Sequence, residues 1–107
     1  MLLIREVFHC KPGKVRPLVE KFLAMSKLNE KMGFGKMRVM TDFAGENYWT
    51  LVSEWEVASM KDFEELMQAQ PDDPEITKEF EKIMKDYHDL IDHGHREIYK
   101  IEEASTT

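Results

Sequence analysis

The order of hydrophobic and polar positions along the chain predicts four β-strands. Residues 2–10 are rich in aliphatic and aromatic side chains and stop at Lys11-Pro12-Gly13, a pattern typical of a strand followed by a turn. The predicted strands cover residues 2–10, 36–43, 48–57 and 95–102. A turn at 44–47 is expected to join the second and third strands. Alternation in the third predicts one face with Trp49, Leu51, Trp55 and Val57, and an opposite face with Thr50, Glu54 and Glu56.

Three other segments repeat apolar residues at three- and four-residue steps, which predicts amphipathic helices. These segments are residues 14–32, 59–69 and 74–92. Gly33 and Gly35 are expected to end the first helix, and Gly94 the third, because glycine adopts the left-handed conformation found at many helix stops. Ser59 and Asp73 are expected to cap the N-termini of the second and third helices.

The resulting order, β-α-β-β-α-β, predicts an α+β fold of the ferredoxin-like class. In that arrangement helices cover one face of a four-stranded antiparallel sheet, and strands 1 and 3 are central. Apolar side chains occupy both parities of strands 1, 2 and 4, so the other sheet face also needs a cover. A second copy of the sheet is the simplest cover, which predicts a homodimer of the α+β barrel type.

Composition fits one small globular domain. The chain has 107 residues and a formal net charge of −6, and we expect a single domain over residues 1–103 with a disordered tail at 104–107. The acidic balance argues against nucleic-acid binding. A single cysteine, Cys10, excludes an intramolecular disulfide, and neither a signal peptide nor a membrane span is visible. A cytoplasmic location without membrane contact is therefore expected.

Several segments together resemble the NIPSNAP-like proteins of the dimeric α+β barrel superfamily. They are the strand into Lys11-Pro12-Gly13-Lys14, residues 38–42 with Gly45, the strand 55–57 followed by Ser59, and the closing strand 96–99. One position departs: Glu6, beside Arg5, stands where related first strands often carry arginine. The resemblance implies a homodimer with a pocket. It leaves the reaction open, because the superfamily includes cofactor-free monooxygenases, haem enzymes and small-molecule isomerases.

Candidate chemistry lies first in the histidines and carboxylates. His9, at the end of strand 1, and Asp42 are the candidate general bases. The alternative for His9 is a packed or exposed role, and the alternative for Asp42 is to face solvent or to pair with Arg38 and Arg5. Glu54 is expected either to point into the barrel or to pair with Arg5 and Arg38. His88 and Asp92 are four residues apart in the predicted third helix, where they could share a cation or simply solvate the helix end.

Aromatic residues and eight methionines are consistent with an apolar pocket, although an ordinary core is the alternative. The candidate substrate-binding residues are Tyr48, Trp55, Glu54, Arg96 and Tyr99. We expect neither a metal nor another tightly bound cofactor, because no dinucleotide fingerprint or strong metal-ligand spacing is present. Two functions remain open: a homodimer that binds or oxygenates a small apolar or aromatic molecule without a cofactor, and a non-catalytic dimeric interaction or stress-associated module.

Overall fold

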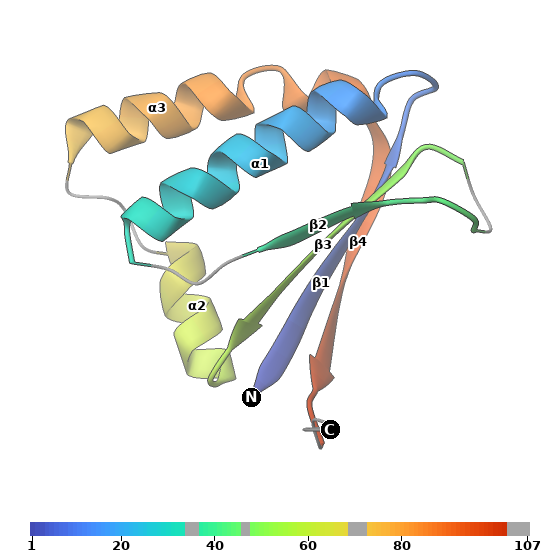
Figure 1. Ribbon diagram of the computed structural model, residues 1–107. Helices are drawn as coiled ribbons and strands as arrows, with labels where there is room; N and C mark the ends of the chain where they lie inside the picture. The colour runs from blue at the N-terminus through green and yellow to red at the C-terminus, as the bar shows by residue number, and fades with distance from the viewer. Residues whose placement is uncertain (34–36, 46–47, 69–72, 103–107) are drawn as a thin grey trace.

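The chain folds as one antiparallel sheet covered by helices on one side. We describe residues 1–33, 37–45, 48–68 and 73–102 in a computed structural model. The strands are β1 (Leu2–Cys10), β2 (Arg38–Thr41), β3 (Thr50–Val57) and β4 (Ile91–Lys100). The helices are α1 (Val15–Lys31), α2 (Met60–Gln68), α3 (Pro74–Met84) and the 3₁₀ helix η1 (Tyr87–Leu90). Figure 1 shows α1 and α3 side by side above the sheet and α2 beyond the end of β3.

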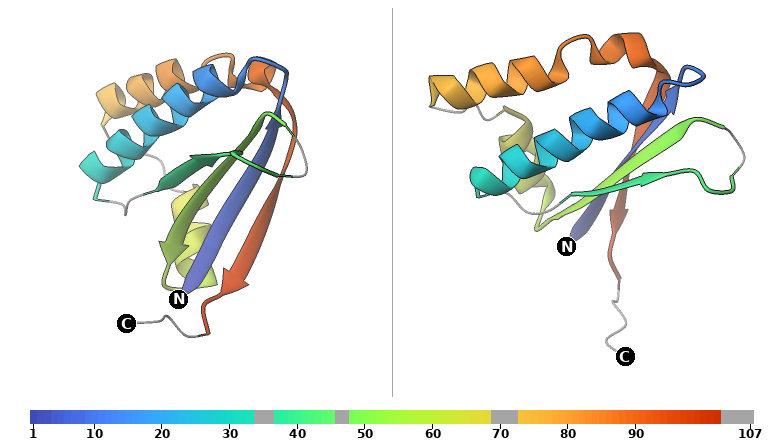
Figure 2. Two further views of the ribbon diagram at one scale, coloured as in Figure 1. Left: turned by 45° about the vertical axis from the view of Figure 1, so that its right-hand side comes forward. Right: turned by 45° about the horizontal axis from the view of Figure 1, so that its top comes forward.

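The strand order is β2-β3-β1-β4, and every pairing is antiparallel. The ferredoxin-like α+β fold with β1 and β3 in the centre is therefore confirmed. Both views in Figure 2 show the three α-helices on the same side of the sheet, so none of the described helices covers the other side. We call these two sides the helix face and the open face.

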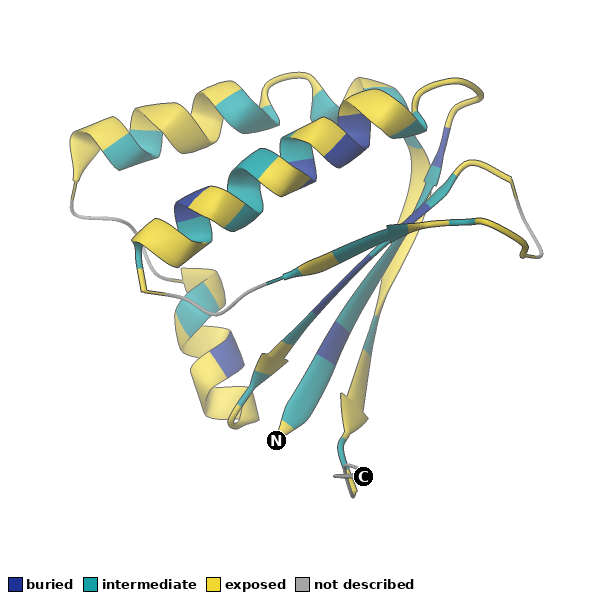
Figure 3. Cartoon of the chain, in the orientation of Figure 1, coloured by how far each residue is buried: buried dark blue, intermediate teal, exposed yellow. Residues whose placement is uncertain are grey.

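The hydrophobic core lies between α1 and the sheet, where the buried stripe of the helix meets it (Figure 3). Leu18, Val19 and Phe22 of α1 pack with Leu51 of β3 and Cys10 of β1 in one buried cluster. Even-numbered residues of β1 share the helix face, because Ile4 pairs with Trp55 and Phe8 with Leu51.

Local helix signals were predicted correctly. The Asp73 side chain accepts a hydrogen bond from the Glu75 backbone N–H at 2.9 Å, and Pro74 is the first helical residue. Ser59 likewise accepts one from the Asp62 backbone N–H at 3.2 Å. Gly33 follows α1 with a positive φ of 84°, while Gly35 lies outside the described residues.

The third helix is shorter than predicted. It ends at Met84 instead of residue 92, and β4 begins at Ile91 instead of residue 95. Asp86 adopts a left-handed φ of 61° between α3 and η1, and β4 then pairs with the whole of β1 from Leu2 to Cys10. Pairing with a strand about 90 residues earlier thus overrides the local helical period.

Gly94 is consequently a sheet residue and not a helix stop. It lies opposite Phe8, and a Cβ atom placed on it would come within 3.0 Å of both Phe8 Cδ1 and the Val7 carbonyl oxygen. Glycine is required here because the Phe8 ring covers the backbone of β4.

The hairpin between β2 and β3 also departs from the predicted alternation. Trp49 has a φ of 60°, so it lies before β3 and does not share a strand face with Leu51. The strands are closed by Asp42, whose backbone N–H donates to the Thr50 carbonyl and whose Oδ1 accepts from the Thr50 N–H at 2.8 Å. Glu46 and Asn47 of the expected turn, and the tail at 104–107, lie outside the described residues.

Candidate functional site

A cavity lies on the helix face, between the sheet and the three α-helices. Its volume is about 1030 Å³. Methionine and aromatic side chains form most of its apolar lining, and leucine adds to it: Phe22, Met25, Met32, Met37, Trp55, Leu66, Met67 and Phe80. Large apolar cavities with few polar groups are the usual form of small-molecule sites. We call this cavity the helix-face cavity.

Aromatic rings hold one wall of the helix-face cavity in place. The Trp55 ring lies 5.7 Å from that of Phe63, a buried residue of α2. The Arg96 guanidinium from β4 lies 5.2 Å from the centre of the Phe63 ring. Aromatic and cation–π contacts of this kind fix α2 against the sheet.

The floor of the helix-face cavity is formed by β1 and β3 and carries two polar side chains. Ser53 is 1% exposed, and Glu6 pairs with it across the strands. The Glu6 carboxylate lies 3.2 Å from the Arg96 guanidinium, which offsets its charge. A neighbouring cavity of about 430 Å³ is lined by Glu6, Arg96 and other residues of η1 and β4, so Glu6 lines both cavities.

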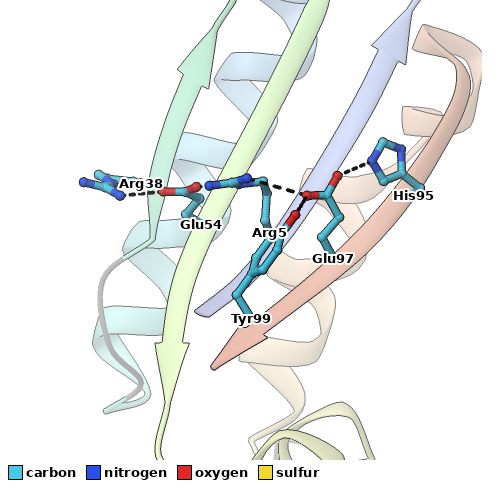
Figure 4. Close-up of polar contacts among 6 residues, drawn as sticks. All are labelled: Arg5, Arg38, Glu54, His95, Glu97 and Tyr99. Carbon is cyan, nitrogen blue, oxygen red and sulfur yellow. Dashed lines mark hydrogen bonds and ion pairs between the residues drawn. The ribbon is translucent and has the colours of Figure 1, made fainter. Parts of the chain in front are cut away.

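The open face carries a different arrangement, a chain of ion pairs that crosses all four strands (Figure 4). Glu54 accepts hydrogen bonds from Arg38 Nη2 at 2.5 Å and Arg5 Nε at 2.6 Å. Arg5 Nη1 also lies 3.5 Å from Glu97 Oε1, which accepts a hydrogen bond from the Tyr99 hydroxyl. The chain ends where His95 Nε2 lies 2.7 Å from Glu97 Oε2. We call these six residues the charged belt.

The belt sets the charge state of its carboxylates. Burial acts to raise the pKa of Glu54, but the hydrogen bonds and charges of Arg5 and Arg38 outweigh it and lower the pKa. Hydrogen bonds from Tyr99 and His95 lower the pKa of Glu97, and the same contact with Glu97 raises the pKa of Tyr99. Glu54 therefore holds β2, β3 and β1 together as a carboxylate, and its pairing with both arginines is one of the two alternatives expected from the sequence.

Three histidines lie close together on the open face, where β1 ends and β4 begins. The His9 ring stacks on that of His93 at 4.4 Å, and its centre lies 6.3 Å from that of His95. Burial lowers the pKa of His9, and repulsion from His93 and His95 lowers it further. The neutral imidazole is therefore favoured at neutral pH.

The sheet separates the site residues predicted from the sequence onto its two faces. Trp55 lines the helix-face cavity, and Arg96 lines the smaller one beside it. Glu54 and Tyr99 belong to the charged belt, and His9 lies with the other histidines. Asp42 closes the β2–β3 hairpin, and Tyr48 is 86% exposed near its tip. Neither predicted base, His9 or Asp42, lines the helix-face cavity, and a catalytic role for either stays a prediction.

The predicted shared helix face for His88 and Asp92 is wrong. His88 lies in η1 and Asp92 in β4, because the third helix ends before either residue. Among the described residues, no group of three histidine, cysteine or acidic side chains has an arrangement that could hold a metal ion. Cys10 is a buried free thiol, and burial raises its pKa.

Sequence reasoning missed several lining residues. Four of the eight methionines line the helix-face cavity, in keeping with the expected methionine-rich pocket, but Ser53 and Phe80 were not singled out as site residues. Glu6 was noted only as a departure from related sequences. Its pairing with Arg96 could not be read from positions 90 residues apart, since that requires the register of β1 with β4.

Similarity to solved structures settles the fold. The structure is similar to a NIPSNAP family protein from Agrobacterium tumefaciens, with a TM-score of 0.73, 13% identity, and 98% of this chain and 96% of that chain covered. The chain shares the NIPSNAP fold. An uncharacterized NIPSNAP domain protein from Burkholderia xenovorans gives a TM-score of 0.67 at 14% identity, covering 100% of this chain and 98% of that one. A second A. tumefaciens protein gives 0.72 at 16%, covering 94% and 92%.

The resemblance found in the sequence is thereby confirmed at the level of fold. No protein-family model and no curated protein sequence matches the chain. The identities of 13–16% lie where structures share a fold without sharing a reaction, so function has to be argued from the site. None of the described helices is both long and apolar enough to cross a bilayer.

Proposed function

We propose that this chain is a homodimeric, cytoplasmic protein that binds a small apolar or aromatic molecule in the helix-face cavity. The observation that carries the binding proposal is the cavity itself, about 1030 Å³ lined mainly by methionine and aromatic side chains. Methionine has three rotatable bonds and a polarisable sulfur, so a wall with four methionines adapts to ligands of varied shape. The free thiol of Cys10 is in keeping with a reducing compartment.

Binding has more support at this cavity than oxygenation of the bound molecule. An oxygenase without a cofactor needs a base that reaches its substrate. The predicted bases His9 and Asp42 lie elsewhere, and the Glu6 carboxylate on the cavity floor is already paired with Arg96. We therefore propose that the cavity binds its ligand without reacting with it.

The homodimer is supported by the open face and the hairpin beside it. Phe43 and Tyr48 of the β2–β3 hairpin are 105% and 86% exposed, and Trp49 beside them is also exposed. Soluble monomers rarely leave such groups of large apolar side chains in water. A second copy placed sheet to sheet would bury them together with the half-buried Val7 and Val52 of the open face.

Binding is tested by titration with N-phenyl-1-naphthylamine, a neutral dye whose fluorescence rises in apolar surroundings. The wild-type protein should bind it with micromolar affinity. Ser53→Leu should weaken binding at least about tenfold, because the added side chain rises from the floor into the cavity. Ser53→Ala is the matched control and should bind as the wild type does.

Dye binding that is absent, or equal in Ser53→Leu and Ser53→Ala, would show that the cavity is part of the core. The interaction-module alternative would then replace the binding proposal. Thermal melts of both variants check that the comparison is between folded proteins.

A further inference from the structure

We infer that the ligand of the helix-face cavity is an apolar cation, such as a hydrophobic amine or a quaternary ammonium compound. This inference rests on the proposed binding function and names the ligand class of the same site. It comes from the charged side chains around the cavity, which include acidic residues but no lysine or arginine among the described lining residues.

The charged side chains among the described lining residues are all acidic. They are Glu6 on the floor, Glu56 at the end of β3, Asp62 and Glu65 on α2, and Glu81 on α3. The chain has 15 Lys and Arg for 21 Asp and Glu, yet no basic residue stands in this described lining.

Two of these acids have a cationic neighbour. The others determine which charge on a ligand the cavity favours. Glu6 is paired with Arg96 at 3.2 Å, and Glu65 lies 4.0 Å from Lys61 in an exposed contact. An exposed pair of this kind is weak and screened by solvent. Asp62 and Glu81 thus contribute negative potential from α2 and α3 around one apolar cavity, whereas the Glu56 side chain shares the open face with Glu54.

The apolar wall suits a cation as well. Trp55, Phe22 and Phe80 line the cavity, and aromatic faces attract cations through the ring quadrupole. The molecule already shows such a contact where Arg96 lies over Phe63. A ligand with an apolar body and one positive charge can bury the body among the methionines and keep the charge near the carboxylates.

An anionic ligand would meet the opposite situation. Its charge would lose water on entering an apolar space without a lining lysine or arginine among the described residues to replace it. A neutral ligand would gain the apolar contacts alone. The expected order of affinity is cation, then neutral molecule, then anion.

The test is displacement of N-phenyl-1-naphthylamine by three competitors with the same alkyl chain. They are octyltrimethylammonium and octyl sulfate, each used below its micelle concentration, and octanol, used below its aqueous solubility. Octyltrimethylammonium should displace the dye at a concentration about tenfold lower than octanol, and octyl sulfate should need more than octanol.

A pair of double variants separates the cavity acids from the general negative charge of the protein. Glu65→Gln with Glu81→Gln removes two lining carboxylates, whereas Glu64→Gln with Glu79→Gln removes two from the same helices that do not line the cavity. Both double variants change the net charge equally. Only the first should weaken octyltrimethylammonium, several-fold, with octanol and the dye unchanged. The single pair Glu81→Gln and Glu79→Gln gives the same comparison if a double variant unfolds.

The outcomes distinguish the two proposals. Dye binding with equal displacement by all three competitors, or an equal loss in both double variants, overturns the cationic ligand and leaves the binding function standing. Failure of the dye to bind the wild-type cavity overturns the binding function itself.

Discussion

Glu54 shows how a single residue can hold an edge strand in place. It is only 5% exposed although it lies on the open face, because Arg5 and Arg38 cover it from the neighbouring strands. β2 has only four residues and pairs with β3 alone, so the Arg38 contact adds to a short ladder of backbone hydrogen bonds. The charged belt therefore stabilises the sheet within a single chain, whether or not the open face also forms an interface.

The first prediction removes this carboxylate. Glu54→Gln should lower the free energy of unfolding by about 2 kcal/mol, because two arginines lose their charged acceptor while the side chain keeps its size. Glu56→Gln, an exposed position on the same strand, removes the same charge and should change stability by less than about 0.5 kcal/mol. Urea denaturation of both variants measures the difference, and equal stabilities would contradict the structural role of Glu54.

The second prediction concerns pH and the stacked histidines. The pKa of His9 is lowered in the folded chain from the ordinary value of 6.5 that it has in the unfolded chain. As the pH falls, His9 is therefore protonated in the unfolded chain before it is protonated in the folded one. Protons then favour the unfolded state, and stability should be complete above pH 6.5 and fall as the pH drops through this value. Urea midpoints at pH 7.5 and 5.5 measure the fall, at matched ionic strength.

His9→Gln should reduce that fall, since it removes the shifted group, whereas the exposed His88→Gln should leave the fall unchanged. The same dependence in both variants would show that the stacked histidines are not its source.

At the scale of elements, what could be predicted depended on how local the determining contact is. The caps at Ser59 and Asp73 use side chains two or three residues from their partners, and both were predicted. The start of β4 was missed because Tyr87, Leu90 and Ile91 continue a helical spacing, and only pairing with β1 turns them away from it.

The same limit applies to the site. Aromatic and methionine content predicted an apolar pocket, but the face of each strand residue depends on register. Arg96 and Tyr99 lie in one strand and on opposite faces of the sheet, beside a cavity and in the charged belt respectively. A shift of one residue in the register of β4 would exchange the two faces.

The third prediction tests the close approach of β4 to β1. Gly94→Ala should destabilise the protein by about 1–3 kcal/mol, because the new methyl group would meet Phe8 and the Val7 carbonyl at 3.0 Å and the strands must move apart. Gly45→Ala is the matched control, since its added Cβ would reach only the Asp42 Cβ at 4.0 Å. Thermal unfolding measures both variants, and a Gly94→Ala protein as stable as the control would contradict this packing.

At the scale of the whole molecule, the sheet divides two kinds of surface. The helix face holds an apolar cavity with acidic lining, whereas the open face holds ion pairs, histidines and half-buried valines. Ligand binding and self-association would therefore use opposite faces of the same sheet. A substitution on one face can be designed to leave the other unchanged, which makes the two proposals separable by experiment.

The last prediction is the homodimer through the open face. Val52 lies at the centre of that face, paired with Val7 of β1 and Met40 of β2, and a second sheet would pack over this apolar group. Light scattering at micromolar concentration should give about twice the chain mass of 12.7 kDa. Val52→Lys should shift the mass to that of one chain, because a buried ammonium without a partner opposes association. Leu23→Lys, on the exposed side of α1, adds the same charge away from the sheet and should remain dimeric.

A wild-type mass near 12.7 kDa would contradict the dimer. A dimer that survives Val52→Lys would place the contact on another surface, with the exposed aromatic residues of the β2–β3 hairpin as the first to examine.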